Sequence, residues 1–175
     1  MSEQDDDMSG ETVSLAAPGR ERRATLRALK SWSNARVDDA IPDLANLTGT
    51  SEMMEAQEIF TGNQFLIMFE AYSTNLVIIF YGSELPEMLV GQAVENNMRQ
   101  SLPMALKNVF QEACMEAVND GDVVYRHGMI NAPSGAGVLY RSIFMPLRSG
   151  SDPDRIYIFG AFSNEAGGSE QLAAA

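Results

Sequence analysis

The spacing of apolar residues changes several times along the chain, and each change marks an expected element. Between residues 20 and 36, Leu26, Leu29 and Trp32 recur at every third position and form one narrow apolar stripe, which predicts a helix. Because an exposed seam with a tryptophan in it is costly to leave in water, this stripe must pack against another surface. That surface can belong to the same domain or to a second copy of the chain.

Two apolar runs with strand character follow, at residues 65–69 and 76–81, and a polar turn at residues 73–75 separates them. They predict a β-hairpin. Short helical turns are expected over residues 83–100. A longer helix is expected from residue 101 to residue 118, because its apolar residues fall at three- and four-residue spacings.

Three more strands are predicted at residues 122–130, 138–147 and 155–163, separated by connections that contain glycine and proline. Five strands split two and three around a helical segment make an α+β fold. We expect an antiparallel sheet with helices on one face and the N-terminal helix as a cap. Such a sheet curves, and its concave face is where a small ligand would bind.

The rest of the chain divides around this domain. Residues 1–19 combine acidic residues with serine, glycine and proline and predict a disordered acidic tail. Residues 20–63 hold the N-terminal helix and an irregular connector, and residues 64–163 form the domain itself. Residues 164–175 predict a second disordered tail.

Charge and composition narrow the function classes. The 12 basic and 24 acidic residues give a net charge of −12, which repels phosphate backbones and disfavours nucleic-acid binding. Half of the basic residues lie between residues 20 and 36. They are consistent with either a solvated helix face or an anion-binding site. No apolar stretch is long enough to span a membrane, no positively charged leader is present, and Cys114 is the single cysteine, so a cytoplasmic protein is expected.

Several short motifs occur in an order that resembles a PAS domain, and more narrowly the bacterial, alphaproteobacterial single-domain PAS-like family. The resemblance covers roughly residues 64–163, with the N-terminal helix as the helical cap. In chain order the motifs are Leu29 and Trp32, Ile41-Pro42, Tyr81-Gly82-Ser83-Glu84-Leu85, Gly91, the strand residues Tyr140, Ile143, Pro146 and Leu147, and Gly160-Ala161. Their order and spacing carry the resemblance.

The resemblance implies sensing, dimerisation or partner docking, and no intrinsic catalysis. We therefore expect a stand-alone regulatory module in bacterial signal transduction. It would form a homodimer and contact a signalling protein such as a histidine kinase. The candidate interface residues are Leu26, Leu29 and Trp32.

A ligand pocket, if the domain has one, would be lined by aromatic and methionine side chains of the strands and the long helix. The candidates are Phe69, Phe80, Phe110, Tyr125, Met129, Tyr140 and Phe144. No cofactor is required. Haem is not expected, because the single histidine, His127, lies in a predicted strand. A position on the protein surface explains this histidine better than a role as a haem ligand. Flavin is not expected, because Cys114 lacks the Asn-Cys-Arg context of flavin-binding members and fits as a packed apolar side chain.

Two other functions remain open from the residues. A small cavity enzyme of the isomerase or dehydratase kind could use Asp122 or Glu70 together with Tyr125 or Tyr140. A ligand-storing module could bind haem or a fatty acid. The order of elements favours the signalling module over the enzyme, because two strands precede the long helix here, whereas such enzymes place several helices before a long curved sheet.

Overall fold

A computed structural model describes residues 20–49, 62–70, 75–82, 84–85, 104–131, 135, 137–150, 152 and 155–166. The helices named below are α1 (Arg20–Ala35), α2 (Leu44–Thr48) and α6 (Met104–Asp120). The strands are β1 (Gln64–Glu70), β2 (Asn75–Tyr81), β3 (Val124–Asn131), β4 (Gly137–Arg148) and β5 (Ile156–Ala166). No helix among these residues is both long enough and apolar enough to cross a membrane.

The strands form one five-stranded antiparallel sheet in the order β2-β1-β5-β4-β3. The last strand therefore lies at the centre, where it joins the early hairpin to the later one. β3 is an edge strand and pairs with β4, from Val124 opposite Phe144 to Asn131 opposite Gly137. The predicted fold class, an antiparallel α+β sheet with a helical cap, is confirmed.

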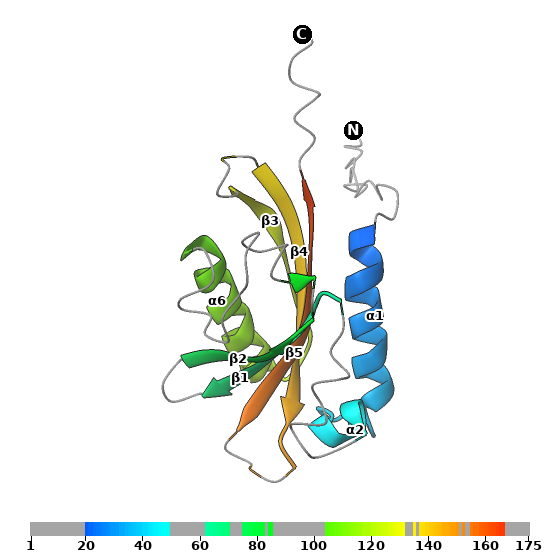
Figure 1. Ribbon diagram of the computed structural model, residues 1–175. Coiled ribbons are helices and arrows are strands. Elements are labelled where there is room, and N and C mark those ends of the chain that lie inside the picture. Colours follow the sequence, from blue (N-terminus) through cyan, green and yellow to red (C-terminus); the bar gives the residue numbers. More distant parts are fainter. Residues whose placement is uncertain are drawn as a thin grey trace, which may run out of the picture.

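Helices cover the sheet from both sides (Figure 1). α6 lies against one face, called the inner face here, and α1 lies against the other, the outer face. Side chains alternate between the two faces along each strand, so two separate cores result. The inner core includes Phe65, Ile67, Ile78, Phe110, Phe144, Ile158 and Phe162, and the outer core includes Trp32, Leu66, Ile143, Met145 and Phe159.

Aromatic rings fill the inner core. Phe110 of α6 meets Phe144 of β4 edge-on, with ring centroids 4.8 Å apart, and lies 5.5 Å from the ring of Phe65. Gly160 of β5 makes room for this cluster. A Cβ atom at Gly160 would lie 2.3 Å from Cζ of Phe65 and 2.4 Å from the carbonyl oxygen of Ile143. Gly160, in the middle of the final strand, therefore has a packing role.

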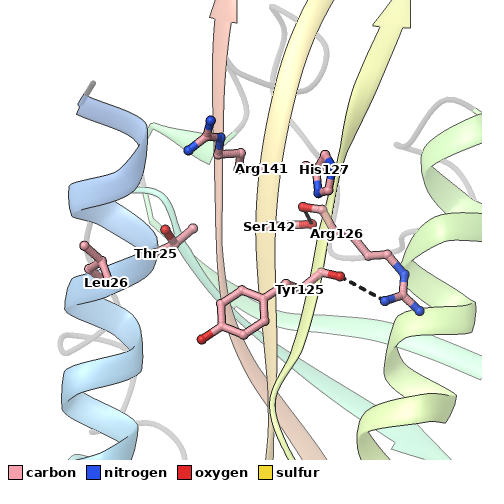
Figure 2. Close-up of a pocket in the computed structure, with 7 residues that line it drawn as sticks. All are labelled: Thr25, Leu26, Tyr125, Arg126, His127, Arg141 and Ser142. Atoms are coloured by element: carbon pink, nitrogen blue, oxygen red, sulfur yellow. Dashed lines mark hydrogen bonds between the residues drawn. The ribbon is translucent and has the colours of Figure 1, made fainter. Parts of the chain in front are cut away.

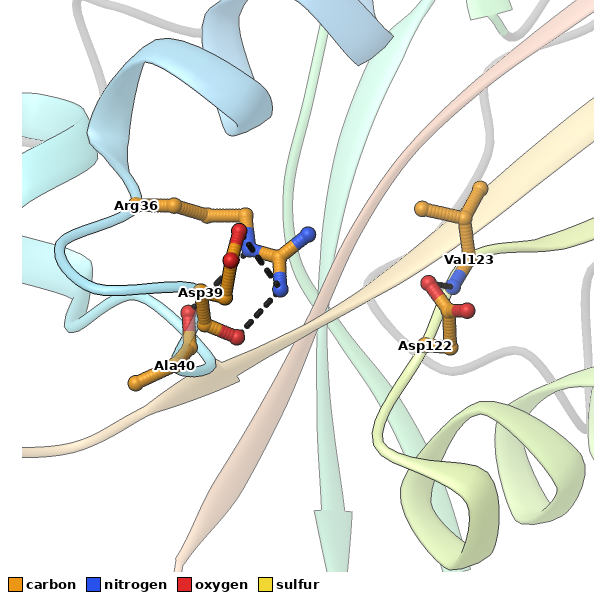
Figure 3. Close-up of polar contacts among 5 residues, drawn as sticks. All are labelled: Arg36, Asp39, Ala40, Asp122 and Val123. Carbon is orange, nitrogen blue, oxygen red and sulfur yellow. Dashed lines mark hydrogen bonds and ion pairs between the residues drawn. The ribbon is translucent and has the colours of Figure 1, made fainter.

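Arg36 fixes the turn that joins α1 to α2 (Figure 3). Its guanidinium lies 4.9 Å from the centroid of the Trp32 ring, and it donates hydrogen bonds to the carbonyl oxygens of Asp39 and Ala40. Asp38 and Asp39 both have left-handed backbone conformations, with φ of 52° and 58°. These two residues reverse the chain, so that α2 contacts α1.

The hairpin, the long helix and the three later strands lie where the sequence predicts them, with small shifts at their ends. Two predictions were wrong in detail. The connector over residues 37–63 is not wholly irregular, because α2 forms within it and ends at Gly49, whose φ of 74° suits glycine. β5 also continues to Ala166, past the predicted start of the tail at residue 164, because its last residues still pair with β4. The predicted tail at residues 1–19, most of the helical turns at 83–100, and residues 167–175 lie outside the described residues.

The substitution Gly160→Ala should strongly destabilise the fold. The added methyl group has to displace both an aromatic ring and a backbone carbonyl, so we expect the free energy of unfolding to fall by about 3 kcal/mol. Urea denaturation followed by circular dichroism measures this change. Gly150→Ala is the matched control, because its Cβ would meet no atom within 4 Å. A Gly160→Ala protein as stable as the control would contradict the close packing of β5.

Candidate functional site

α1 is held on the outer face by two alanines and one tryptophan. Ala24 and Ala28 are small and buried, which lets the helix approach β4 and β5 closely. Trp32 is 2% exposed, and its Nε1 donates a hydrogen bond to the carbonyl oxygen of Pro146 over 2.8 Å. β3 pairs with β4 only as far as Phe144, so the proline at position 146 removes no hydrogen bond to β3.

The outer side of β3 carries apolar side chains that α1 does not cover. Tyr125 lies opposite Ile143, a member of the outer core, and alternation places His127 and Met129 on the same side as Tyr125. Met129 lies opposite Leu139 of β4. The cross-strand register therefore builds one continuous surface on the outer sides of these two strands.

Large apolar side chains on this surface are exposed to solvent. Their exposed fractions are 58% for Leu26, 56% for Tyr125, 68% for Met129 and 50% for Leu139. Two polar side chains, an imidazole and a guanidinium, lie between them, because the register places His127 opposite Arg141. We call this set the open face: Leu26, Tyr125, His127, Met129, Leu139 and Arg141.

A groove of about 460 Å³ runs between α1 and β3 at one end of the open face. Thr25 and Leu26 line it from the helix, and Tyr125 and His127 line it from the sheet. Figure 2 shows Tyr125 reaching from β3 toward α1, whereas Arg126 points the other way, toward α6. There Arg126 forms an ion pair with Glu116. β3 thus directs Arg126 inward and Tyr125 outward.

The electrostatics of the open face differ from those of the protein as a whole. The chain has a net charge of −12, yet the charged side chain at the centre of the open face is the cation Arg141, which forms no ion pair within the described part of the chain. Desolvation raises the pKa of Tyr125, and the nearby Asp122 carboxylate raises it further. The Tyr125 hydroxyl therefore stays neutral and available as a hydrogen-bond donor.

The three predicted interface residues have different positions. Leu26 is exposed and belongs to the open face, and Leu29 is half-buried beside the outer core. Trp32 is buried against the sheet of its own chain, so the prediction that it contacts a second molecule was wrong. From the sequence, the apolar stripe of this helix could pack either on its own domain or on a second copy of the chain. In the structure, α1 packs on its own domain.

Three of the predicted pocket residues come together on the inner face. Phe110, Tyr140 and Phe144 belong to the inner core, where the ring of Tyr140 stacks on that of Phe162 at a centroid distance of 5.5 Å. Burial raises the pKa of Tyr140, and the charge of Arg126 opposes that rise. In the described residues these rings pack directly on one another.

The other predicted pocket residues do not join them. The prediction of one pocket lined by all seven residues was therefore wrong. Tyr125 and Met129 lie on the open face, and Phe80 packs against the outer core. Phe80 is turned outward by an irregularity in the register between β1 and β2, where Leu66 pairs with Phe80 but Ile67 pairs with Ile78. The side chain of Phe69 lies outside the described residues.

The remaining candidate residues are divided between the two faces of the sheet. His127 is exposed on the edge strand, as the sequence predicts, and Cys114 is buried in the inner core, where burial raises the pKa of its thiol well above the usual range. Tyr125 and Tyr140 lie on opposite faces of the sheet. The Asp122 carboxylate accepts a hydrogen bond from the backbone amide of Val123 over 2.7 Å, as Figure 3 shows.

Comparisons with known proteins assign no family. No protein-family model matches the chain, and no curated protein matches it. Among solved structures, a sensory box histidine kinase/response regulator from Burkholderia thailandensis E264 is similar with 9% identity and a TM-score of 0.39, over 59% of this chain and 77% of that one.

Two light-oxygen-voltage (LOV) proteins are also similar. An RNA-binding light-oxygen-voltage receptor has 15% identity and a TM-score of 0.41, over 74% of this chain and 36% of its own length. A fungal LOV domain photoreceptor has 14% identity and a TM-score of 0.39, over 80% of this chain and 88% of its own length. These identities and TM-scores are too low to carry an argument, so fold and function rest on the residues of this chain.

Substitutions on the two sides of α1 should separate its structural contact from its exposed side. Trp32→Ala removes a buried ring and is expected to lower the free energy of unfolding by about 3–5 kcal/mol. Trp32→Phe keeps a ring but leaves the Pro146 carbonyl without its donor, so a loss of about 1–2 kcal/mol is expected. Leu26→Ala should change stability by less than about 0.5 kcal/mol. Urea unfolding measures all three, and equal losses for Trp32→Ala and Leu26→Ala would contradict the placement of α1.

Proposed function

We propose that this chain is a PAS-type sensory and signalling module that acts by binding proteins and not by catalysis. It forms a homodimer and contacts a signalling partner such as a histidine kinase, and the open face is its docking surface. Support comes from the order of its elements, from the helical cap on the outer face, and from the resemblance of its motifs to those of PAS domains.

The exposure of the open face is the observation that carries the proposal. Apolar side chains from α1, β3 and β4 form a patch that no helix or strand of the described residues covers, and such contiguous patches mark interaction sites. The composition also fits an interface, since tyrosine, methionine and arginine are enriched there. Tyr125, Met129 and Arg141 supply all three residue types.

A small apolar ligand is a second candidate for the groove. Its volume of about 460 Å³ lies in the range of small-molecule sites, about 300–1,000 Å³. The cavity-enzyme alternative has less support. It needs an acid and a tyrosine at one enclosed site, whereas Asp122 and the nearby Tyr125 are both exposed and Tyr140 lies on the opposite face of the sheet.

An aspartate in the open face should weaken self-association. Met129→Asp and Leu139→Asp each place a charge in the apolar patch, where burial against a second copy would require its desolvation. We expect the dimer dissociation constant to rise at least about tenfold, equivalent to about 1.4 kcal/mol. Sedimentation velocity over a range of protein concentrations measures the shift.

Met115→Asp is the matched control, because Met115 is an exposed methionine on α6, which covers the opposite face of the sheet. It should leave the dimer intact, and circular dichroism should show that all three variants are folded. A dimer that both open-face variants leave unchanged would remove the open face from self-association.

A further inference from the structure

A second pocket lies at the end of the sheet where β4 finishes and β5 begins. Its volume is about 430 Å³, within the range of about 300–1,000 Å³ for small-molecule sites. Pro146 lies opposite Ile158 of the inner core, so this end of β4 lines the pocket from the inner face. We call it the end pocket, and its residues used below are Ile41, Asp43, Val118, Pro146, Arg148 and Ile156.

Apolar side chains from three parts of the chain form the floor of the end pocket. Ile156 belongs to β5, Val118 to the last turn of α6, and Ile41 to the segment between α1 and α2, and all three are half-buried. Packing holds these parts together, because a Cβ atom at Gly121, just after α6, would lie 3.3 Å from Cδ1 of Ile41. A ligand with an apolar body would cover the area that these side chains still expose.

An aspartate and an arginine stand side by side at this pocket. Asp43 and Arg148 form a parallel β-bridge, and the backbone amide of Arg148 donates a hydrogen bond to the carbonyl oxygen of Pro42 over 2.9 Å. Neither side chain forms an ion pair within the described part of the chain. Arg155 also lines the pocket, but its Nε lies 3.1 Å from a carboxylate oxygen of Asp152. One carboxylate and one guanidinium are therefore available to a ligand.

These two charges select the chemical class of the ligand. A simple anion would be repelled by Asp43 and by the net charge of −12, and a simple cation would meet both arginines. A zwitterion matches both groups. Its carboxylate can accept paired hydrogen bonds from the guanidinium, and its ammonium can donate to the aspartate.

We infer that the end pocket binds a free amino acid with an apolar side chain. The carboxylate of the ligand binds Arg148, and its ammonium binds Asp43. Its side chain lies on the apolar floor that Ile41, Val118 and Ile156 provide.

The end pocket shares Pro146 with the contact that anchors α1. This proline lines the pocket, and its carbonyl oxygen accepts the hydrogen bond from Nε1 of Trp32 over 2.8 Å. A ligand in the end pocket therefore lies beside the anchor of the helix that borders the groove. Its role as a sensory input rests on the proposed function, whereas the binding itself does not.

Ligand analogues test the class on the unmodified full chain. In nitrogen–proton NMR correlation spectra, L-leucine and L-phenylalanine should shift the amide resonances of Ile41, Asp43 and Arg148 in a saturable way. Hydrocinnamate lacks the ammonium of phenylalanine, and phenethylamine lacks its carboxylate. Each should bind at least about tenfold more weakly than L-phenylalanine, because one charge of the pocket stays unpaired. L-serine, which lacks an apolar side chain, should also bind more weakly.

Two variants separate the two charge contacts. Asp43→Asn should weaken L-phenylalanine binding at least about tenfold without weakening hydrocinnamate, which loses a repulsive neighbour. Arg148→Gln should weaken L-phenylalanine equally without weakening phenethylamine. Asp38→Asn and Arg27→Gln are the matched controls, because both residues are exposed and do not line the end pocket. Both controls should bind as the wild type does, and circular dichroism should show that all four variants are folded.

Three results would overturn the inference. One is the absence of saturable shifts with both L-leucine and L-phenylalanine at about 10 mM, where a ligand with a Kd of about 1 mM is nearly saturating. Another is equal affinity for L-phenylalanine and its two analogues, which would indicate apolar adsorption only. The third is a set of shifts centred on Tyr125 and Arg141, which would place the amino acid in the groove. The dimer test of the open face is independent of all three, so the two proposals fail separately.

Discussion

The contact of Trp32 with the carbonyl of Pro146 fixes where α1 crosses the outer face, and the exposed surface follows from that position. A helix is about 10–12 Å wide with its side chains, and neighbouring strands are about 4.8 Å apart, so one helix covers about two strands. α1 packs over β4 and β5, with Ala24 and Ala28 holding it close. β3 is one strand further out, and its outer side chains are left beyond the edge of the helix.

β3 makes this exposure informative, because Val124 and Ile130 face the inner core as expected while large apolar side chains also lie on its solvent side. A half-covered strand normally turns its apolar residues toward the core and its charges toward solvent. Here Arg126 points inward to Glu116, and Gly128 faces the ring of Tyr140, whose Cε1 would lie 3.1 Å from a Cβ at that position. Tyr125 and Met129 point outward. Since α6 and the inner core do not require them, these apolar side chains are better explained by contact with another molecule.

The sequence predicts the elements well, because each has a strong local signal, but it does not predict which side of an element faces the core. On β2, alternation from Leu76 and Ile78 would place Phe80 inward, and the register irregularity near Ile79 turns it outward. On β3, choosing the side with the larger apolar residues selects the solvent side. On α1, the large residues suggest a contact through Leu26, whereas the helix packs through Ala24, Ala28 and Trp32, because small side chains allow the closest approach.

The open face is built from both a helix and the sheet. Leu26 belongs to α1, whereas Tyr125 and Arg141 belong to the sheet, so the width of the groove depends on the position of the helix. That position is set by the packing of Ala24, Ala28 and Trp32 on the sheet and by the turn that Arg36 stabilises. The inner core lies on the opposite face of the sheet from these contacts. A shift of α1 therefore changes the width of the groove while the contacts within the inner core stay the same.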